Sequence, residues 1–243
     1  MNRQRRDRSD SEAPVRVRVF INHLELSRAW QCAHAKITGR ELTSTDRSNA
    51  QNESRDINWE ALPDAILAQI DKLDYVQNSE KEIQAIDVYA SITRDNSNAK
   101  AELETWLDEE LDPLAGFQVH IFARRKDQSK HHCGNCNAVL EKSELVKGLN
   151  TKVACDMLSH AVDNSYDIGV LVMGDDELAP SILCVQEIFD KQIIHVGTSS
   201  EGDGIRSAAW GNFSLEDLMP DIVSQEDFKK QYAKARRTAK SNT

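Results

Sequence analysis

Short apolar runs alternate with amphipathic stretches along most of the chain. Five apolar runs predict buried strands, over residues 15–21, 82–92, 117–122, 168–173 and 193–196. Apolar residues at helical spacing predict helices over 24–37, 58–73, 98–111, 151–164 and 176–189. Strands that alternate with helices are typical of a parallel sheet with helices on both faces. We therefore expect an α/β fold, a three-layer sandwich around a mostly parallel central sheet.

Polar segments flank and interrupt this pattern. Residues 1–14 predict a disordered basic arm, and residues 226–243 predict a basic C-terminal tail. Residues 15–225 between them have the length and apolar content of one large domain. Within that domain we expect a flexible insertion at 38–56 and a charged, Cys/His-containing excursion at 124–146.

The formal net charge of -10 argues against a general affinity for nucleic acid, but the charge is unevenly distributed. Residues 1–18 carry six arginines, and residues 226–243 carry six lysines and arginines, so the middle of the chain is strongly acidic. Acidic side chains between basic ends suit a carboxylate-lined metal site that is served by cationic arms. Solvated tails with no binding role are the alternative interpretation.

Compartment and membrane association follow from composition. No run of about 18 apolar residues occurs, and the polar start of the chain lacks the apolar segment of a secretory signal. Five cysteines at irregular spacing fit a reducing compartment better than a disulfide framework. We expect a cytoplasmic protein with no membrane partner.

Candidate functional residues lie where two predicted strands end. Asn22 follows the first strand, and Gly174-Asp175-Asp176-Glu177 follows the fourth. Ligands of open parallel sheets collect at the carboxyl ends of the strands, so these residues are candidates for a binding site. Capping of the next helix by Asp175 or Asp176 is the simpler alternative.

Three separated segments resemble NYN-domain (LabA-like) ribonucleases. Residues 147–158 read Lys-Gly-Leu-Asn-Thr-Lys-Val-Ala-Cys-Asp-Met-Leu, residues 170–178 read Val-Leu-Val-Met-Gly-Asp-Asp-Glu-Leu, and Asn22 ends the run Val-Phe-Ile-Asn. The resemblance covers roughly residues 15–197. It implies a PIN-like Rossmannoid fold and an RNA endonuclease that hydrolyses phosphodiester bonds with Mg²⁺ or Mn²⁺.

By position, the resemblance implies a metal site formed by Asn22, Asn150, Asp175 and Glu177, with Asp156 completing the catalytic set. The family has aspartate at positions 22, 150 and 177. Asparagine supplies an oxygen without a charge, and losing one electrostatic stabiliser commonly costs on the order of 10²–10³ in rate. Three explanations of the two asparagines stay open. The chain was deliberately inactivated, or it is a natural pseudo-nuclease, or Asp175, Asp156 and Glu177 suffice for the metal site.

One further cluster suggests a structural Zn²⁺ site. His131, His132, Cys133 and Cys136 supply four candidate ligands within six residues, and Cys32 could contribute from elsewhere. An exposed polar loop with free thiols is the alternative.

Basic residues near the motif are candidate RNA contacts: Lys147, Lys152, Arg124 and Arg125. A solvated loop that balances nearby acids is the alternative. Four tryptophans and two cysteines lie in apolar helical contexts, which predicts core positions for Trp30, Trp59, Trp106, Trp210, Cys155 and Cys184.

Two functions are consistent with these features, and a third is disfavoured. The first is a metal-dependent RNA endonuclease that is impaired by Asn22 and Asn150. The second is a pseudo-nuclease that binds RNA, or assembles with other copies, without cutting. A nucleotide-binding or phosphotransferase fold is disfavoured because no glycine-rich phosphate loop occurs among the ten glycines.

Overall fold

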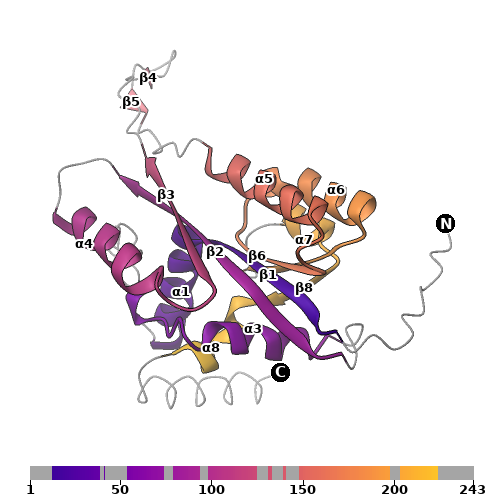
Figure 1. The fold of residues 1–243 in the computed structure, drawn as a ribbon. Coiled ribbons are helices and arrows are strands. Elements are labelled where there is room, and N and C mark those ends of the chain that lie inside the picture. The colour runs from indigo at the N-terminus through magenta and orange to yellow at the C-terminus, as the bar shows by residue number, and fades with distance from the viewer. Residues whose placement is uncertain are drawn as a thin grey trace, which may run out of the picture.

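A computed structural model describes residues 13–38, 41, 54–73, 79–93, 98–124, 131–132, 139–140, 148–197 and 203–223. Its centre is a six-stranded sheet in the order β3-β2-β1-β6-β7-β8 (Figure 1). Every neighbouring pair in this sheet is parallel. The strands are β1 (Val15–Asn22), β2 (Lys81–Thr93), β3 (Phe117–Arg124), β6 (Ile168–Val172), β7 (Gln192–Gly197) and β8 (Gly211–Ser214).

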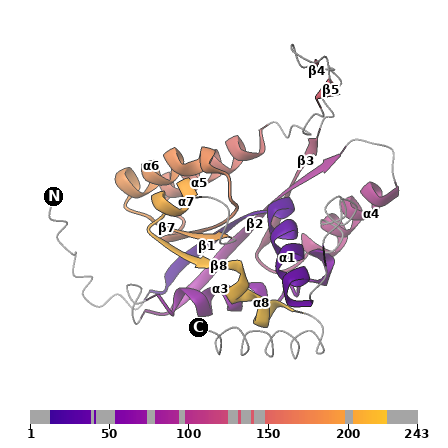
Figure 2. The ribbon, with the colours of Figure 1, turned by 180° about the vertical axis from the view of Figure 1, so that it is seen from behind.

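Helices cover both faces of the sheet (Figures 1 and 2). One face packs against α1 (His23–Thr38), α3 (Leu62–Ile70), α4 (Asn98–Trp106) with its π-helical continuation Leu107–Leu111, and α8 (Leu215–Ile222). The other face packs against α5 (Leu149–Val162), α6 (Ala179–Phe189) and α7 (Asp203–Ala208). The expected three-layer α/β sandwich with a parallel sheet is therefore confirmed.

Burial on both faces explains the apolar strands. All five residues of β6 are buried, and β1 is buried from Val17 to its end. Alternate residues of β1 enter different layers: Val19 and Ile21 pack with α1, α3 and α8, whereas Phe20 packs with α5 and α6. Strand β6 therefore reads as a continuous apolar run because neither of its faces contacts water, whereas β1 is interrupted by Arg16 and by the buried Arg18.

The chain between 203 and 222 contains three elements that the apolar pattern does not predict. They are α7, β8 and α8. Strand β8 has only four residues, so it offers almost no periodicity. Helix α8 carries a sequence signal, since the Ser214 hydroxyl and the Asp217 carboxylate form a reciprocal capping box.

Core predictions are confirmed for the tryptophans but not for the cysteines. Trp30, Trp59 and Trp106 are buried, and Trp210 packs partly buried against the same core. Placing both Cys155 and Cys184 in the core was wrong: Cys155 is exposed on α5 and Cys184 is half-buried on α6. Both side chains lie beside the buried stripes of their helices, which are formed by neighbours such as Val153 and Val185.

Several predicted segments fall wholly or partly outside the described residues. These include residues 1–12 of the arm, most of the 38–56 insertion, most of the 124–146 excursion, and the tail. Ser54–Asp56, at the end of the expected insertion, forms a short 3₁₀ helix in which Ser54 is buried. Within the excursion, β4 (His131–His132) pairs with β5 (Val139–Leu140) in an antiparallel arrangement. None of the helices in the described ranges has the length and apolar character needed to span a membrane.

Candidate active site

The strand order reverses direction between β1 and β6. From β1 the chain goes to β2 on one side, and from β6 it goes to β7 on the other. In open parallel sheets a crevice forms outside the carboxyl ends of the two strands at this point, and ligands bind there. Ile21 pairs with Val172, so Asn22 lies beside the chain that leaves β6 towards Gly174 and Asp175.

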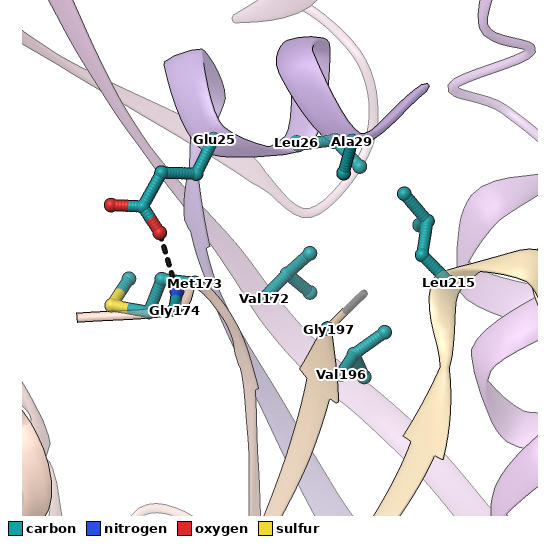
Figure 3. Close-up of a pocket in the computed structure, with 9 residues that line it drawn as sticks. All are labelled: Glu25, Leu26, Ala29, Val172, Met173, Gly174, Val196, Gly197 and Leu215. Atoms are coloured by element: carbon teal, nitrogen blue, oxygen red, sulfur yellow. Dashed lines mark hydrogen bonds between the residues drawn. The ribbon is translucent and has the colours of Figure 1, made fainter. Parts of the chain in front are cut away.

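Asn22 contributes a nearly buried amide at this edge, with 7% of its surface exposed. Its Nδ2 donates to Glu25 Oε1 at 2.7 Å. Glu25 lies in the first turn of α1, and its Oε2 accepts a hydrogen bond from the backbone nitrogen of Gly174 (Figure 3). Glu25 therefore joins the start of α1 to the end of β6, next to the Asp175 position.

Asn150 brings α5 to the same edge. Its Nδ2 donates to Asp175 Oδ2 at 2.5 Å and contacts Glu177 Oε2 at 3.4 Å. Asp175 also caps the 3₁₀ turn Asp176–Leu178, since its Oδ1 accepts from Glu177 nitrogen at 3.0 Å. The capping interpretation is thus correct for Asp175, and the same carboxylate also takes the amide of Asn150.

The structure brings together three of the predicted metal positions and links the fourth to them. Asn150, Asp175 and Glu177 are in direct contact. Asn22 connects to them through Glu25 and the backbone of Gly174. Glu25 was not a sequence-predicted site residue, although an acid three residues after a strand-terminal Asn22 was a visible signal.

Asp156 has different partners. Its Oδ2 accepts from the Tyr89 hydroxyl at 2.8 Å, and its Oδ1 accepts from Lys152 Nζ. Tyr89 pairs in register with Asn22, so Asp156 lies over β2 on the α5 side of the sheet. The structure therefore places Asp156 beside the predicted site, in a hydrogen-bonded pair of its own.

The donors at this edge suit an amide–carboxylate network better than a metal ion. Asn22 and Asn150 both turn the nitrogen of their amide towards a carboxylate. No three His, Cys, Asp or Glu side chains in the described ranges are grouped so that they could hold a metal ion. A divalent cation needs several oxygen ligands and negative charge around it, so these residues as they stand do not fit Mg²⁺ or Mn²⁺.

A buried ion pair supports the neighbouring part of the sheet. Arg18 donates to Asp87 through Nε at 2.7 Å and a terminal nitrogen at 3.1 Å, and their side chains are 8% and 2% exposed. His120 Nε2 lies 3.2 Å from Asp87 Oδ1, and its ring stacks on Tyr89 with centroids 4.9 Å apart. This network connects β1, β2 and β3 to Asp156.

Electrostatics in the network favour the ionised carboxylate. Burial acts to raise the pKa of Asp87, but hydrogen bonds and charge from His120 and Arg18 outweigh it and hold this pKa below its ordinary value. The pKa of Tyr89 is raised, mainly by burial and by the nearby Asp87 and Asp156 carboxylates, so the phenol stays protonated and donates. Charged residues inside otherwise apolar strands, at 18 and 87, were the sequence signal for this pair.

A small pocket adjoins Glu25 (Figure 3). Its volume is about 20 Å³, which is room for one water molecule. Its walls come from α1, β6, β7 and α8: Glu25, Leu26, Ala29, Val172, Met173, Gly174, Val196, Gly197 and Leu215. The pocket is too small and too apolar to hold a nucleotide.

The remaining candidate residues are only partly described. Lys152 is paired with Asp156 and 44% exposed, so part of its charge is already balanced. Arg124 ends β3 and His131 and His132 form β4, but their side chains are outside the described set. Arg125, Lys147, Cys133 and Cys136 lie wholly outside the described residues, so the zinc prediction stays untested. Cys32 is exposed on α1.

Comparisons with known proteins give no family. No family model matches the chain, and no curated protein matches it. A protein of unknown function from Vibrio parahaemolyticus, VPA0982, superposes with a TM-score of 0.47 and 14% identity, over 86% of this chain and 98% of that one. Sir2Tm bound to a propionylated peptide gives a TM-score of 0.30 and 9% identity, over 94% and 93% of the two chains. At these scores neither neighbour bears on what the present chain does.

Proposed function

We propose that this chain is a metal-dependent RNA endonuclease domain of the NYN type, impaired in this form by Asn22 and Asn150. One observation carries the proposal. Asn150 and Asp175, which come from separate parts of the resembling motif, meet at 2.5 Å at the edge where parallel sheets bind ligands. Glu177 joins them, and Glu25 connects them to Asn22.

Aspartate at positions 22 and 150 would change the electrostatics of this edge. Each substitution replaces an N–H donor by a charged oxygen that faces another carboxylate. Like charges at this distance repel, and a hard divalent cation with oxygen ligands relieves that repulsion. The restored residues would thus supply the ligands that the present asparagines do not.

A second candidate is a natural pseudo-nuclease that binds RNA or assembles without cutting. The hydrogen bonds of the two asparagines favour it. Each amide satisfies a carboxylate that a cation would otherwise bind, so the cluster is complete without a metal. In that case RNA affinity, rather than turnover, is the function of the domain.

Cleavage of labelled single-stranded and hairpin RNAs by the N22D/N150D double variant separates the two functions. We expect the variant to cut RNA with Mn²⁺ or Mg²⁺, to stop in EDTA, and to lose activity on further substitution of Asp175→Asn. Salt-sensitive RNA binding with no cleavage by the folded double variant would favour the pseudo-nuclease. If the folded double variant neither binds nor cleaves RNA, both functions are contradicted.

A further inference from the structure

A second and larger pocket lies at the carboxyl ends of β7 and β8. Its volume is about 260 Å³, and its walls are His195, Gly197, Arg206, Asn212, Phe213, Ser214 and Asp217. Gly197 lines this pocket and the small one beside Glu25. The polar lining and the size set it apart from the small pocket, and neither the resemblance nor the proposed metal residues account for it.

Strand β7 connects the pocket to the candidate active site. His195 is 2% exposed, and its Nε2 lies 2.9 Å from the carbonyl oxygen of Met173, which precedes Gly174 and Asp175. A carbonyl only accepts, so Nε2 carries the proton, and the second ring nitrogen of the neutral imidazole is an acceptor. The pocket is lined by β7 and β8, which are one and two strands from β6, so it extends over roughly 5–10 Å from that strand.

Arg206 gives the pocket a cation that has no paired partner among the described residues. It is exposed on α7, and no hydrogen bond or ion pair engages its guanidinium among the residues that the structure describes. A guanidinium presents five donors in a planar fork that matches phosphate geometry. Arg206 is therefore available to an anionic ligand.

Neutral polar groups lie beside this cation. Asn212 is exposed at the pocket wall and offers an amide donor and acceptor. The Ser214 oxygen accepts from Glu216 nitrogen at 3.2 Å, which leaves its own proton free to donate. The Asp217 carboxylate faces the backbone nitrogen of Ser214 at 3.4 Å, so its charge is held at the start of α8.

We propose that this pocket binds a nucleotide of the RNA strand close to the scissile bond. Arg206 binds the phosphate, and Asn212 and Ser214 bind the sugar or base by hydrogen bonds. Phe213 packs against the core rather than offering a free face, so recognition relies on these polar contacts instead of stacking. This assignment rests on the proposed function and adds a substrate subsite to it.

Binding of nucleoside 5′-monophosphates to the full chain in EDTA tests the assignment. Titrations of the four ribonucleotides and of inorganic phosphate can be followed by calorimetry or by ¹⁵N chemical shifts. We expect at least one mononucleotide to bind more tightly than phosphate alone. Arg206→Ala should weaken that binding about tenfold or more, the loss expected when a hydrogen bond to a charged group is removed. Arg206→Lys should restore only part of it, because lysine lacks the fork.

Arg55→Ala is the matched control, since Arg55 is exposed on the 3₁₀ helix Ser54–Asp56 and does not line the pocket. It should bind like the parent chain, and unchanged circular dichroism should show that all variants are folded. The assignment is overturned if Arg206→Ala leaves nucleotide binding unchanged. It is also overturned if phosphate binds as tightly as every mononucleotide, or if no mononucleotide binds. EDTA keeps this test separate from the metal-dependent proposal, whose failure would show in cleavage instead.

Discussion

Two amide groups decide the chemistry of the candidate active site at the level of single residues. Asparagine and aspartate have nearly the same shape, but the asparagine nitrogen donates where an aspartate oxygen only accepts. Asn150 donates to Asp175 at 2.5 Å, and Asn22 donates to Glu25 at 2.7 Å. The present chain therefore stabilises its own carboxylates without an ion.

Asn150→Asp should destabilise the metal-free protein. The change removes the hydrogen bond to Asp175 and places a third carboxylate beside Asp175 and Glu177, which should cost about 1–3 kcal/mol at neutral pH. Urea unfolding measures this loss, and millimolar Mn²⁺ should reverse part of it. Asn58→Asp is the control, because Asn58 caps the turn at Ala61 and aspartate caps equally well. Equal stability of the two variants would contradict the arrangement at Asn150.

The strands show most clearly what the sequence could and could not predict at the level of elements. Burial on both faces makes β6 a continuous apolar run, and β1 keeps Val at alternate positions and ends in Val-Phe-Ile, so the positions of both strands and the parallel sheet were predictable. Pairing between strands depends on residues far apart in sequence. Nothing local connects Arg18 to Asp87, or Glu25 to Gly174. Asn22, Asp175 and Glu177 were indicated by their places after predicted strands, and Asn150 was found through the resemblance. Glu25 and Arg206 needed the folded arrangement.

Asp87→Asn should strongly destabilise the sheet. It leaves the Arg18 guanidinium buried without a charged partner, and breaking a buried pair typically costs about 3–5 kcal/mol. The midpoint of urea unfolding measures the effect. A double variant, Arg18→Met with Asp87→Leu, should recover most of the loss because it removes both charges. A loss below 1 kcal/mol for Asp87→Asn would show that the pair is not buried as described.

The same ion pair predicts how stability depends on pH. The folded pKa of Asp87 is lower than the value of 3.8 expected in the unfolded chain. The folded state therefore binds this proton less readily, so the stabilisation is present above pH 3.8 and is lost as pH falls through the folded pKa. Urea unfolding at pH 6 and pH 3 should show a smaller drop for the double variant than for the parent chain. An equal loss of unfolding free energy in the two proteins between pH 6 and pH 3 would contradict the role of Asp87 in this pH dependence.

Charge distribution matters at the scale of the whole molecule. The net charge is -10, yet residues 226–243 carry six basic side chains. If RNA binds at the sheet edge, an acidic protein needs such cationic segments to approach phosphates. The tail lies outside the described residues, so its contribution is a prediction from the sequence alone.

Removal of residues 226–243 should weaken RNA binding and flatten its dependence on salt. Each phosphate contact to single-stranded RNA adds about 0.7 to the slope of log affinity against log salt. Filter binding or fluorescence anisotropy at several salt concentrations measures both quantities. A variant with the six basic residues changed to glutamine separates charge from chain length. An unchanged slope in both would exclude the tail from RNA binding.

The proposed function requires that positions 22, 150, 175 and 177 form one site at the edge of the parallel sheet. Binding of Mn²⁺ to the N22D/N150D variant, followed by electron paramagnetic resonance, tests it most directly. We expect bound Mn²⁺ in this variant, much weaker binding in the present chain, and loss of binding when Asp175→Asn is added. Folded N22D/N150D protein that binds no Mn²⁺, or binding that survives Asp175→Asn, would contradict the claim.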